Sequence, residues 1–351
     1  MSKKNKLVLS CNENQGASVS SYAGVSANAN EMRPFLNEEG QPCIIANGEA
    51  VEIQANANVT LPYQAWLDID ERVIAASEDR LVGIGDLINM GLTHDLGGLG
   101  ATVSQWDKMS SLTPANVSMD GETQGEKDRV TFGQDSVPIP IIHKDFTISQ
   151  RARLASERTG ESLDTTSAFV ASQKVSEKSE DMLFGSVSVT VGSASISSYT
   201  NFANRNTHTI STAWDLVTDN EDIVDDVIAM MDLARADGYY GPYKLYIPSE
   251  YEGVMDKSFK AASGNKDTVR DRLMQIAMLN GIGVADRLAD NNVVLVQMTP
   301  DVVDLAVGQT LAAVEWTNNA GFTGNHKVFA AWAPRLKSDY DGNCGIVHGS
   351  V

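Results

Sequence analysis

Histidines, cysteines and carboxylates are the side chains most able to do chemistry, and in this 351-residue chain they are not spaced for it. The three cysteines, Cys11, Cys43 and Cys344, lie far apart without C-x-x-C spacing, so neither a disulfide framework nor a zinc site is predicted. The histidines show no H-E-x-x-H spacing, which would place two metal ligands on one helix face; they are His94, His143, His208, His326 and His348. We therefore expect incidental thiols, ordinary surface or core histidines, and no bound metal.

Two stretches imitate catalytic or cofactor motifs. The glycine-rich residues 95–100 (DLGGLG) lack the Lys-Ser/Thr of a phosphate-binding loop and the preceding strand of a dinucleotide fold, which favours a simple turn. The carboxylates of Asp68, Asp70 and Glu71 fall on a predicted helix, where solvated acidic side chains are the simpler interpretation. Since no G-x-S-x-G elbow occurs either, we expect no enzyme, cofactor or small-molecule substrate.

The chain is strongly acidic, with a formal net charge of −19. Residues 215–310 alone hold 17 acidic and 8 basic residues, a net charge of −9. Tight phosphate binding needs clustered Lys and Arg, so this balance excludes a protein that adheres to nucleic acid over its whole surface. An acidic wall can nevertheless enclose DNA without adhering to it. The sequence shows no run of about 20 apolar residues and no signal-peptide segment, so we expect no membrane partner and synthesis in the cytoplasm.

The elements along the chain change in character near residue 60. Residues 1–60 hold nine asparagines among many serines and alanines, a composition that cannot build its own core and that favours an arm ordered on neighbouring chains. Within the arm, Asn47-Gly48 between two apolar runs predicts a short hairpin. Apolar residues at helical spacing then predict a helix over 61–83, followed by a glycine-rich segment over 83–112.

The middle of the chain predicts a β-hairpin and a long helix. Residues 113–137 are polar, with turn glycines, and are typical of a long exposed hairpin; the proline-containing residues 137–142 then continue as an edge strand or loop. After a short helix over 149–158, a helix from Asp164 or Thr165 to Phe184 spans about 30 Å. Its apolar stripe is thin, and Glu180 is placed with the charges of a wide solvated face. Such a helix is suited to backing a flat sheet.

The last third predicts a second α/β segment. Residues 218–221 (TDNE) match a capping box before a helix ending near Gly238. Strands are predicted over 243–247 and 292–297, with a helix over 268–279 between them and several β segments over 302–333.

Several of these stretches, in this order, resemble the encapsulin-like branch of the Hong Kong 97-type capsid proteins of tailed double-stranded DNA bacteriophages. The resemblance covers about 61–345 and is carried by residues 66–73, 137–153, 159–166, 171–185, 241–251, 304–309 and 315–316. It implies an α+β fold with an N-terminal arm, an extended loop, a peripheral domain with a long spine helix, and an axial domain. The implied boundaries are 1–60 for the arm, 61–112 for the helix and glycine-rich segment, 113–137 for the loop, 138–214 for the peripheral domain, 215–320 for the axial domain and 321–351 for a C-terminal return to the peripheral domain.

The function that the resemblance implies is structural. Such a chain is a major capsid protein that assembles with itself as pentamers and hexamers into an icosahedral shell around viral DNA, in a virion built in the host cytoplasm. Portal, scaffold or cement proteins are further partners, and packaged double-stranded DNA is contacted weakly and nonspecifically. The residues expected at subunit interfaces are Lys127, Arg129, Phe132, Arg151, Arg153, Gly241, Pro242 and Tyr243.

Two alternatives stay open beside the viral capsid. Encapsulins share the fold and enclose cargo enzymes, although the long polar arm and the length favour the viral protein; an α/β enzyme is the third class. Some members of the fold also join a loop lysine to an asparagine of a neighbouring subunit, for which Lys127 and Asn343 are the candidates here. That reaction needs a buried carboxylate as proton acceptor, and the sequence identifies none, so an ordinary ion pair of Lys127 or Arg129 is the expectation.

Overall fold

The computed structural model describes residues 35–36, 42–46, 49–52, 63–110, 112–113, 115–117, 119, 127–149, 151, 155, 158, 165–185, 187, 189–259, 267–317 and 323–351. These residues divide between two compact units. Unit 1 draws on residues 1–101, 139–181 and 305–332, and unit 2 on residues 102–138, 182–304 and 333–351. Because the chain passes repeatedly between the units, neither is one continuous stretch of sequence.

Short strands near the start of the chain form a three-stranded antiparallel sheet. β1 (Phe35–Leu36), β2 (Pro42–Ala46) and β3 (Glu49–Glu52) follow one another in that order. Ala46 pairs with Glu49, which is the register that a hairpin turning at residues 47 and 48 requires. The hairpin prediction is confirmed for its strands, while the turn residues and the rest of the predicted arm lie outside the described residues.

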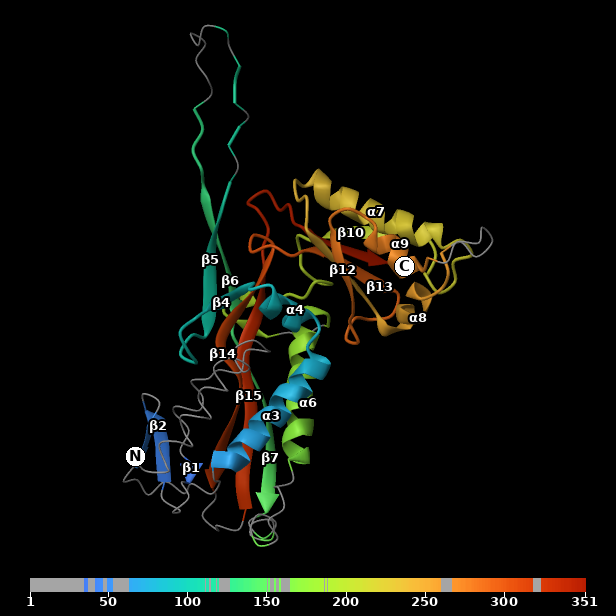
Figure 1. The fold of residues 1–351 in the computed structure, drawn as a ribbon. Coiled ribbons are helices and arrows are strands. Elements are labelled where there is room, and N and C mark those ends of the chain that lie inside the picture. Colours follow the sequence, from blue (N-terminus) through green and yellow to red (C-terminus); the bar gives the residue numbers. More distant parts are fainter. Residues whose placement is uncertain are drawn as a thin grey trace. The chain divides into compact units, whose positions relative to one another are not determined.

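Unit 1 is built on a four-stranded sheet of order β4-β14-β15-β7 (Figure 1). β14 (Val303–Thr317) and β15 (Thr323–Leu336) are 15 and 14 residues long, where the sequence predicted several shorter segments; their ends at 303–304 and 333–336 belong to unit 2. β4 (Thr93–Asp95) runs parallel to β14, and β7 (Ile141–Ser149) pairs antiparallel with β15 at the sheet edge, where its preceding prolines placed it.

Two long helices pack on this sheet. α3 (Tyr63–Arg80) buries Trp66 and Ile69, and Trp66 meets His326 of β15 edge to face at 5.8 Å. α6 (Thr166–Leu183) is the predicted long helix, and the Ser179 hydroxyl accepts a 3.0 Å hydrogen bond from the Trp332 indole of β15. The thin apolar stripe predicted for α6 is confirmed by its buried members, Ala168, Ala171, Val175, Met182 and Leu183.

Two carboxylates of these helices were predicted to be solvated but are buried. Glu180 is only 3% exposed, because α6 turns it inward, where it accepts hydrogen bonds from the backbone N–H groups of Gly83 and Ile84 at 3.1 and 2.9 Å. These donors open α4 (Gly83–Asn89), a short helix that glycines hid from the sequence pattern. Asp70 on α3 is 8% exposed, so it is not a solvated carboxylate as expected.

The glycine-rich loop after β4 is a turn, as predicted. Gly97 and Gly98 have positive φ angles, and the Gly97 N–H donates to the Asp95 carboxylate at 2.8 Å. A three-residue strand does precede the loop, contrary to expectation, but the next element is a strand and not a helix. The arrangement therefore lacks the helix N-terminus on which a phosphate-binding loop depends.

Unit 2 contains a five-stranded sheet of order β10-β16-β13-β11-β12. Its strands are β10 (Asn206–Thr209), β11 (Tyr243–Ile247), β12 (Leu279–Val284), β13 (Asn292–Gln297) and β16 (Ile346–Ser350). α7 (Glu221–Ala236), α8 (Glu252–Met255) and α9 (Val269–Met274) supply the other side of a hydrophobic core that includes Val227, Leu245 and Leu295. The bounds of β11 and β13 confirm the two predicted strands.

Unit 2 contains one strand that the sequence did not assign, and it corrects one prediction. The unassigned strand is β16, which lies between β10 and β13 and has four of its five residues buried. The predicted C-terminal segment 321–351 thus supplies β15 to the four-stranded sheet and β16 to the five-stranded sheet. The predicted capping box before α7 is wrong, since Asn220 is the N-cap without a side-chain cap; the box exists at α9, between Thr268 and Asp271.

Candidate assembly surface

A two-stranded hairpin projects from unit 2 (Figure 1). β5 (Val103–Met109) pairs antiparallel with β6 (Phe132–Pro138), from Val103 opposite Pro138 to Met109 opposite Phe132. The sequence placed this hairpin at 113–137, so its outgoing strand begins ten residues earlier than predicted. The strand was missed because residues 103–109 mix polar and apolar side chains, and the preceding glycines suggested loop.

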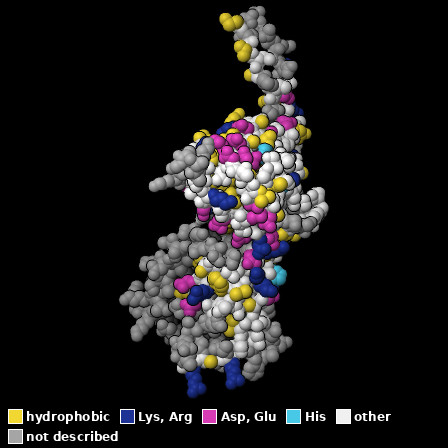
Figure 2. Space-filling view, turned by 90° about the vertical axis from the view of Figure 1, so that its right-hand side faces the viewer, with side chains coloured by type: hydrophobic (Ala, Val, Ile, Leu, Met, Phe, Trp, Pro, Cys, Tyr) yellow, Lys and Arg dark blue, Asp and Glu magenta, His cyan; other side chains and the backbone are white. Residues whose placement is uncertain are grey.

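The far end of the hairpin exposes large apolar side chains (Figure 2). Met109 is 65% exposed and its cross-strand partner Phe132 is 72% exposed. Beyond this pair, the described residues Leu112, Val117 and Met119 are 53%, 99% and 105% exposed. Single exposed apolar residues are common, but a series on one projecting element is a candidate contact surface.

The root of the hairpin, which we define as residues 103–106 and 135–138, is held by a buried ionic network. The Arg335 guanidinium donates from Nε and Nη2 to both oxygens of Asp304, the first bond being 2.5 Å, and from Nη1 to the Ser104 hydroxyl of β5 at 3.2 Å. It also lies 5.6 Å over the Trp106 ring. Lys337 donates to Asp304 at 2.7 Å, so this carboxylate has two cationic partners.

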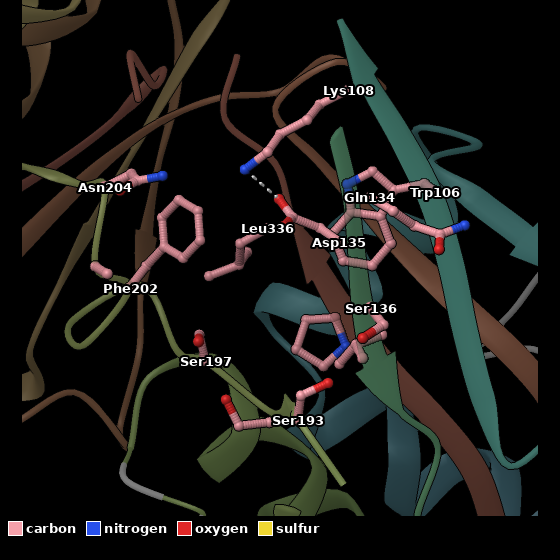
Figure 3. Close-up of a pocket in the computed structure, with 14 residues that line it drawn as sticks. Trp106, Lys108, Gln134, Asp135, Ser136, Ser193, Ser197, Phe202, Asn204 and Leu336 are labelled. Atoms are coloured by element: carbon pink, nitrogen blue, oxygen red, sulfur yellow. Dashed lines mark ion pairs between the residues drawn. The ribbon is translucent and has the colours of Figure 1, made fainter. Parts of the chain in front are cut away.

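A cavity of about 390 Å³ lies beside the root (Figure 3). Trp106 of the hairpin faces Phe202 and Asn204 across it, while the side chain of Gln134 extends away from them. The half-buried ion pair between Lys108 and Asp135, 3.0 Å long, also lies in the lining. The remaining lining includes serines of the turn at β8 (Thr190–Val191) and β9 (Ala194–Ser195), namely Ser193, Ser195 and Ser197. The lining is mostly polar and combines serine hydroxyls with the ion pair of Lys108 and Asp135.

Three of the predicted interface residues lie on the hairpin's return path. Lys127 and Arg129 are exposed, as is Phe132, while the Asp128 carboxylate between the two cations accepts from the N–H groups of Thr113 and Arg129 at 3.0 and 2.7 Å. The Asp128 bonds link the two sides of the hairpin beyond its strands. The structure thus brings these predicted residues together on one element.

The other predicted interface residues are dispersed. Arg151 is exposed, and Arg153 lies outside the described residues. Gly241 and Pro242 are half-buried, and the Gly241 N–H donates to the Gln297 side chain at 2.8 Å. Tyr243 is fully buried within the chain and its hydroxyl donates to the Tyr239 carbonyl, so its side chain does not reach the surface of the single chain. Its place at a subunit interface stays a prediction.

Some residues of this surface were not found from the sequence. Arg335 and Asp304 are 31 positions apart, and no local spacing indicated their pairing; Met109 was assigned to a glycine-rich segment. Beside Gly241, the exposed aromatic side chain is Tyr240, which is 68% exposed. Tyr240, which precedes the predicted residues 241–243, is therefore the tyrosine that reaches the surface here.

The titratable groups with large pKa shifts are structural. Burial lowers the pKa of His326 to about 4, where its ring stacks on Phe146 at 5.1 Å, and burial raises the pKa of the Cys344 thiol to about 12. Cys43 and Cys344 are buried and form no disulfide. Burial also raises the pKa of Glu180 to about 7, although its two backbone donors oppose the shift.

Among the described residues, no group of three His, Cys, Asp or Glu side chains could hold a metal ion. None of the helices in this part of the chain is long and apolar enough to span a membrane.

Comparison with known proteins identifies the fold. Residues 55–349 match the model of DUF6260, a family of unknown function, and no curated protein sequence gives a significant match. The virus-like particle protein of Pyrococcus furiosus superposes with a TM-score of 0.60 at 18% identity, over 82% of this chain and 99% of that one.

Two phage proteins are similar to a comparable degree. The capsid chain of Myoviridae phage XM1 gives a TM-score of 0.57 at 11% identity, over 74% of this chain and 88% of that one. A chain of Mycobacterium phage Bobi gives 0.53 at 13% identity, over 86% and 95%. The α+β architecture described above is therefore the Hong Kong 97-type capsid fold that the sequence resemblance implied.

Proposed function

The chain belongs to the DUF6260 family, and from this fold we propose that it is the major shell-forming protein of a tailed double-stranded DNA virus. The observation that carries the proposal is the projecting hairpin of unit 2, whose far end leaves Met109 and Phe132 exposed. A monomer gains nothing from these side chains in water, whereas a neighbouring copy can bury them. The protein therefore acts through contacts between copies and not through a reaction.

In the proposed shell, copies assemble as pentamers and hexamers that close into an icosahedron. Burying one exposed Met or Phe contributes about 1.5–3 kcal/mol, so the pair at the hairpin's end supplies about 3–6 kcal/mol per subunit. Each subunit both gives and receives such a contact in a ring, and closure multiplies it. Modest contacts thus give a stable shell.

The proposed cargo is packaged double-stranded DNA, contacted weakly. A net charge of −19 opposes phosphate binding, and only local cations such as the exposed Arg151 and Arg158 favour it. Filter binding of the unassembled protein to duplex DNA should show weak retention that disappears as salt rises from about 50 to 200 mM. Tight, salt-resistant retention would contradict this part of the proposal.

An encapsulin-type compartment is the second candidate. The virus-like particle protein of Pyrococcus furiosus is matched over 99% of its length, so the fold accommodates a shell of that kind equally well. Portal, scaffold or cement partners belong to the viral proposal alone. The contents of the particles therefore distinguish the two candidates.

The test is electron microscopy of the chain expressed alone, with mass spectrometry of whatever co-purifies. Closed polyhedral particles without an enzyme support the capsid protein. Particles filled with one enzyme would transfer the proposal to the encapsulin, and a monodisperse monomer or dimer would refute both.

A further inference from the structure

Arg335 lies where β5 meets the ends of β14 and β15 that belong to unit 2. It lies near the end of β15 and is 6% exposed, and its partner Asp304, at the start of β14, is 8% exposed. Its third donor reaches Ser104 of β5 at 3.2 Å. One guanidinium therefore connects β5, the outgoing strand of the hairpin, to the start of β14 and the end of β15.

The contacts of Arg335 are directional. The planar guanidinium uses Nε and Nη2 for the two oxygens of Asp304 and Nη1 for the Ser104 hydroxyl, so the position of β5 is fixed in the plane of the fork. Its Cζ atom lies 5.6 Å from the centre of the Trp106 ring, a contact that also positions the next inward residue of β5. A lysine ammonium has no such plane and could not hold both partners in this geometry.

The network is not arranged for stability alone. Lys337 lies 2.7 Å from Asp304 and also donates to the Pro300 carbonyl at 2.6 Å, so Asp304 keeps a cationic partner when Arg335 is removed. Replacing a buried ion pair with apolar side chains of similar volume is often neutral for stability. What no apolar replacement reproduces is the link to Ser104.

The hairpin amplifies small changes at its root. Six residue steps separate Val103 from Met109, which is about 20 Å at about 3.3 Å per residue. A tilt of about 10° at the root would move Met109 by about 3.5 Å, roughly the whole width of an apolar contact. The direction of the root therefore decides whether Met109 and Phe132 reach a neighbouring copy.

We propose that Arg335 is a positioning residue for assembly, which sets the direction of the hairpin through its fork to Asp304 and Ser104. The inference rests on the proposed function, because it concerns how the hairpin reaches another copy. It assigns to Arg335 no contact with that copy. Its effect is on the geometry of unit 2 before assembly.

The test compares three variants of the full chain. Arg335→Met removes the fork, Arg335→Lys keeps a cation beside Asp304, and Asp304→Leu with Arg335→Met replaces the pair with apolar side chains. The matched control is Lys108→Met, which removes the 3.0 Å ion pair to Asp135 on the other strand of the hairpin and leaves Arg335, Asp304 and Ser104 unchanged. Light scattering gives the threshold concentration for particle formation, and amide hydrogen exchange compares β5 and β6 with β11 and β13.

We expect all three root variants to raise the assembly threshold at least tenfold, with faster exchange in β5 and β6 and unchanged exchange in β11 and β13. Lys108→Met should stay within about twofold of the wild type. Rescue of assembly by Arg335→Lys or by the double variant would overturn the proposal, because either would show that charge or stability suffices. If Arg335→Met fails to fold, the double variant decides alone. Absence of particles from the wild type would instead refute the proposed function.

Discussion

Shortening Phe132 to alanine tests whether the end of the hairpin serves the monomer or the assembly. Phe132 is 72% exposed and pairs across the hairpin with Met109, so the monomer buries little of its ring. We expect Phe132→Ala to change the free energy of unfolding of the unassembled chain by no more than about 0.5 kcal/mol, as at other exposed positions.

The expected effect on assembly is larger. Burying a Phe side chain against a neighbour contributes about 1.5–3 kcal/mol, and a loss of about 2 kcal/mol per subunit corresponds to a factor of about 30 in an association constant. The threshold concentration for particle formation should therefore rise by about 30-fold. Light scattering over a dilution series measures it, and urea unfolding of the dissociated protein measures monomer stability.

Leu216 provides the matched control. It is 70% exposed in unit 2 but lies outside the hairpin, so Leu216→Ala removes a similar exposed apolar side chain without touching the proposed contact. Its assembly threshold should stay near that of the wild type. Equal thresholds for Phe132→Ala and the wild type, or an equal shift in Leu216→Ala, would refute the assignment of the hairpin as a contact element.

One further prediction concerns the hairpin, and two concern buried titratable groups of unit 1. Phe132→Pro should block assembly while the monomer still folds, as gel filtration and circular dichroism would show, because proline removes the N–H at the strand's end; particles of this variant would contradict it. The pKa of His326 is about 4 in the folded chain and 6.5 in the unfolded chain, so its contribution to the free energy of unfolding is complete above about pH 6.5. This contribution falls by about 3 kcal/mol as the pH drops to 4. In urea unfolding, His326→Leu should lose this pH dependence. The raised pKa of Glu180, about 7 against 4.5, acts in the opposite sense: its contribution is full below pH 4.5 and falls by about 3 kcal/mol as pH rises through 7. Glu180→Gln keeps an oxygen that can accept from Gly83, so its free energy of unfolding should rise relative to that of the wild type between pH 5 and pH 8. If the difference between variant and wild type is the same at both pH values, the raised pKa of Glu180 is refuted.

The two pH effects overlap between pH 4.5 and 6.5 and oppose each other there. The wild-type curve alone would therefore look flat even though both groups titrate. Each contribution is read from the difference between a variant and the wild type, measured on the unassembled chain. Since Glu180 and His326 belong to unit 1, neither effect depends on the hairpin.

Local patterns predicted the regular elements well where one face is buried. The apolar spacing of 61–83 and 164–184 predicted α3 and α6, and the short apolar runs at 243–247 and 292–297 predicted β11 and β13. These elements follow from nearest-neighbour periodicity, which a single sequence contains in full. Their order and motifs also carried the resemblance to the capsid fold, which the structural comparisons confirm.

Elements whose stability comes from distant partners were missed. β16 is a five-residue strand that is recognisable only once β10 and β13 flank it. α4 contains two glycines, and the distant Glu180 carboxylate accepts hydrogen bonds from the backbone of its first turn. The outgoing strand of the hairpin likewise depends on its pairing with β6. No local pattern distinguishes such segments from loop, because the stabilising contacts are absent from the window in which the pattern is read.

By itself, the sequence determined the composition of this protein, its acidity, its long helices and the class of fold to which they belong. Only the tertiary structure decided which side chains serve the surface and which the core. It buried Tyr243 and Glu180, exposed Met109 beside Phe132, and joined Arg335 to Asp304 and Ser104. The physical reason is that periodicity along a chain determines which side chains share one face of a helix or strand. Whether that face is buried or exposed depends on contacts with residues far away in the sequence.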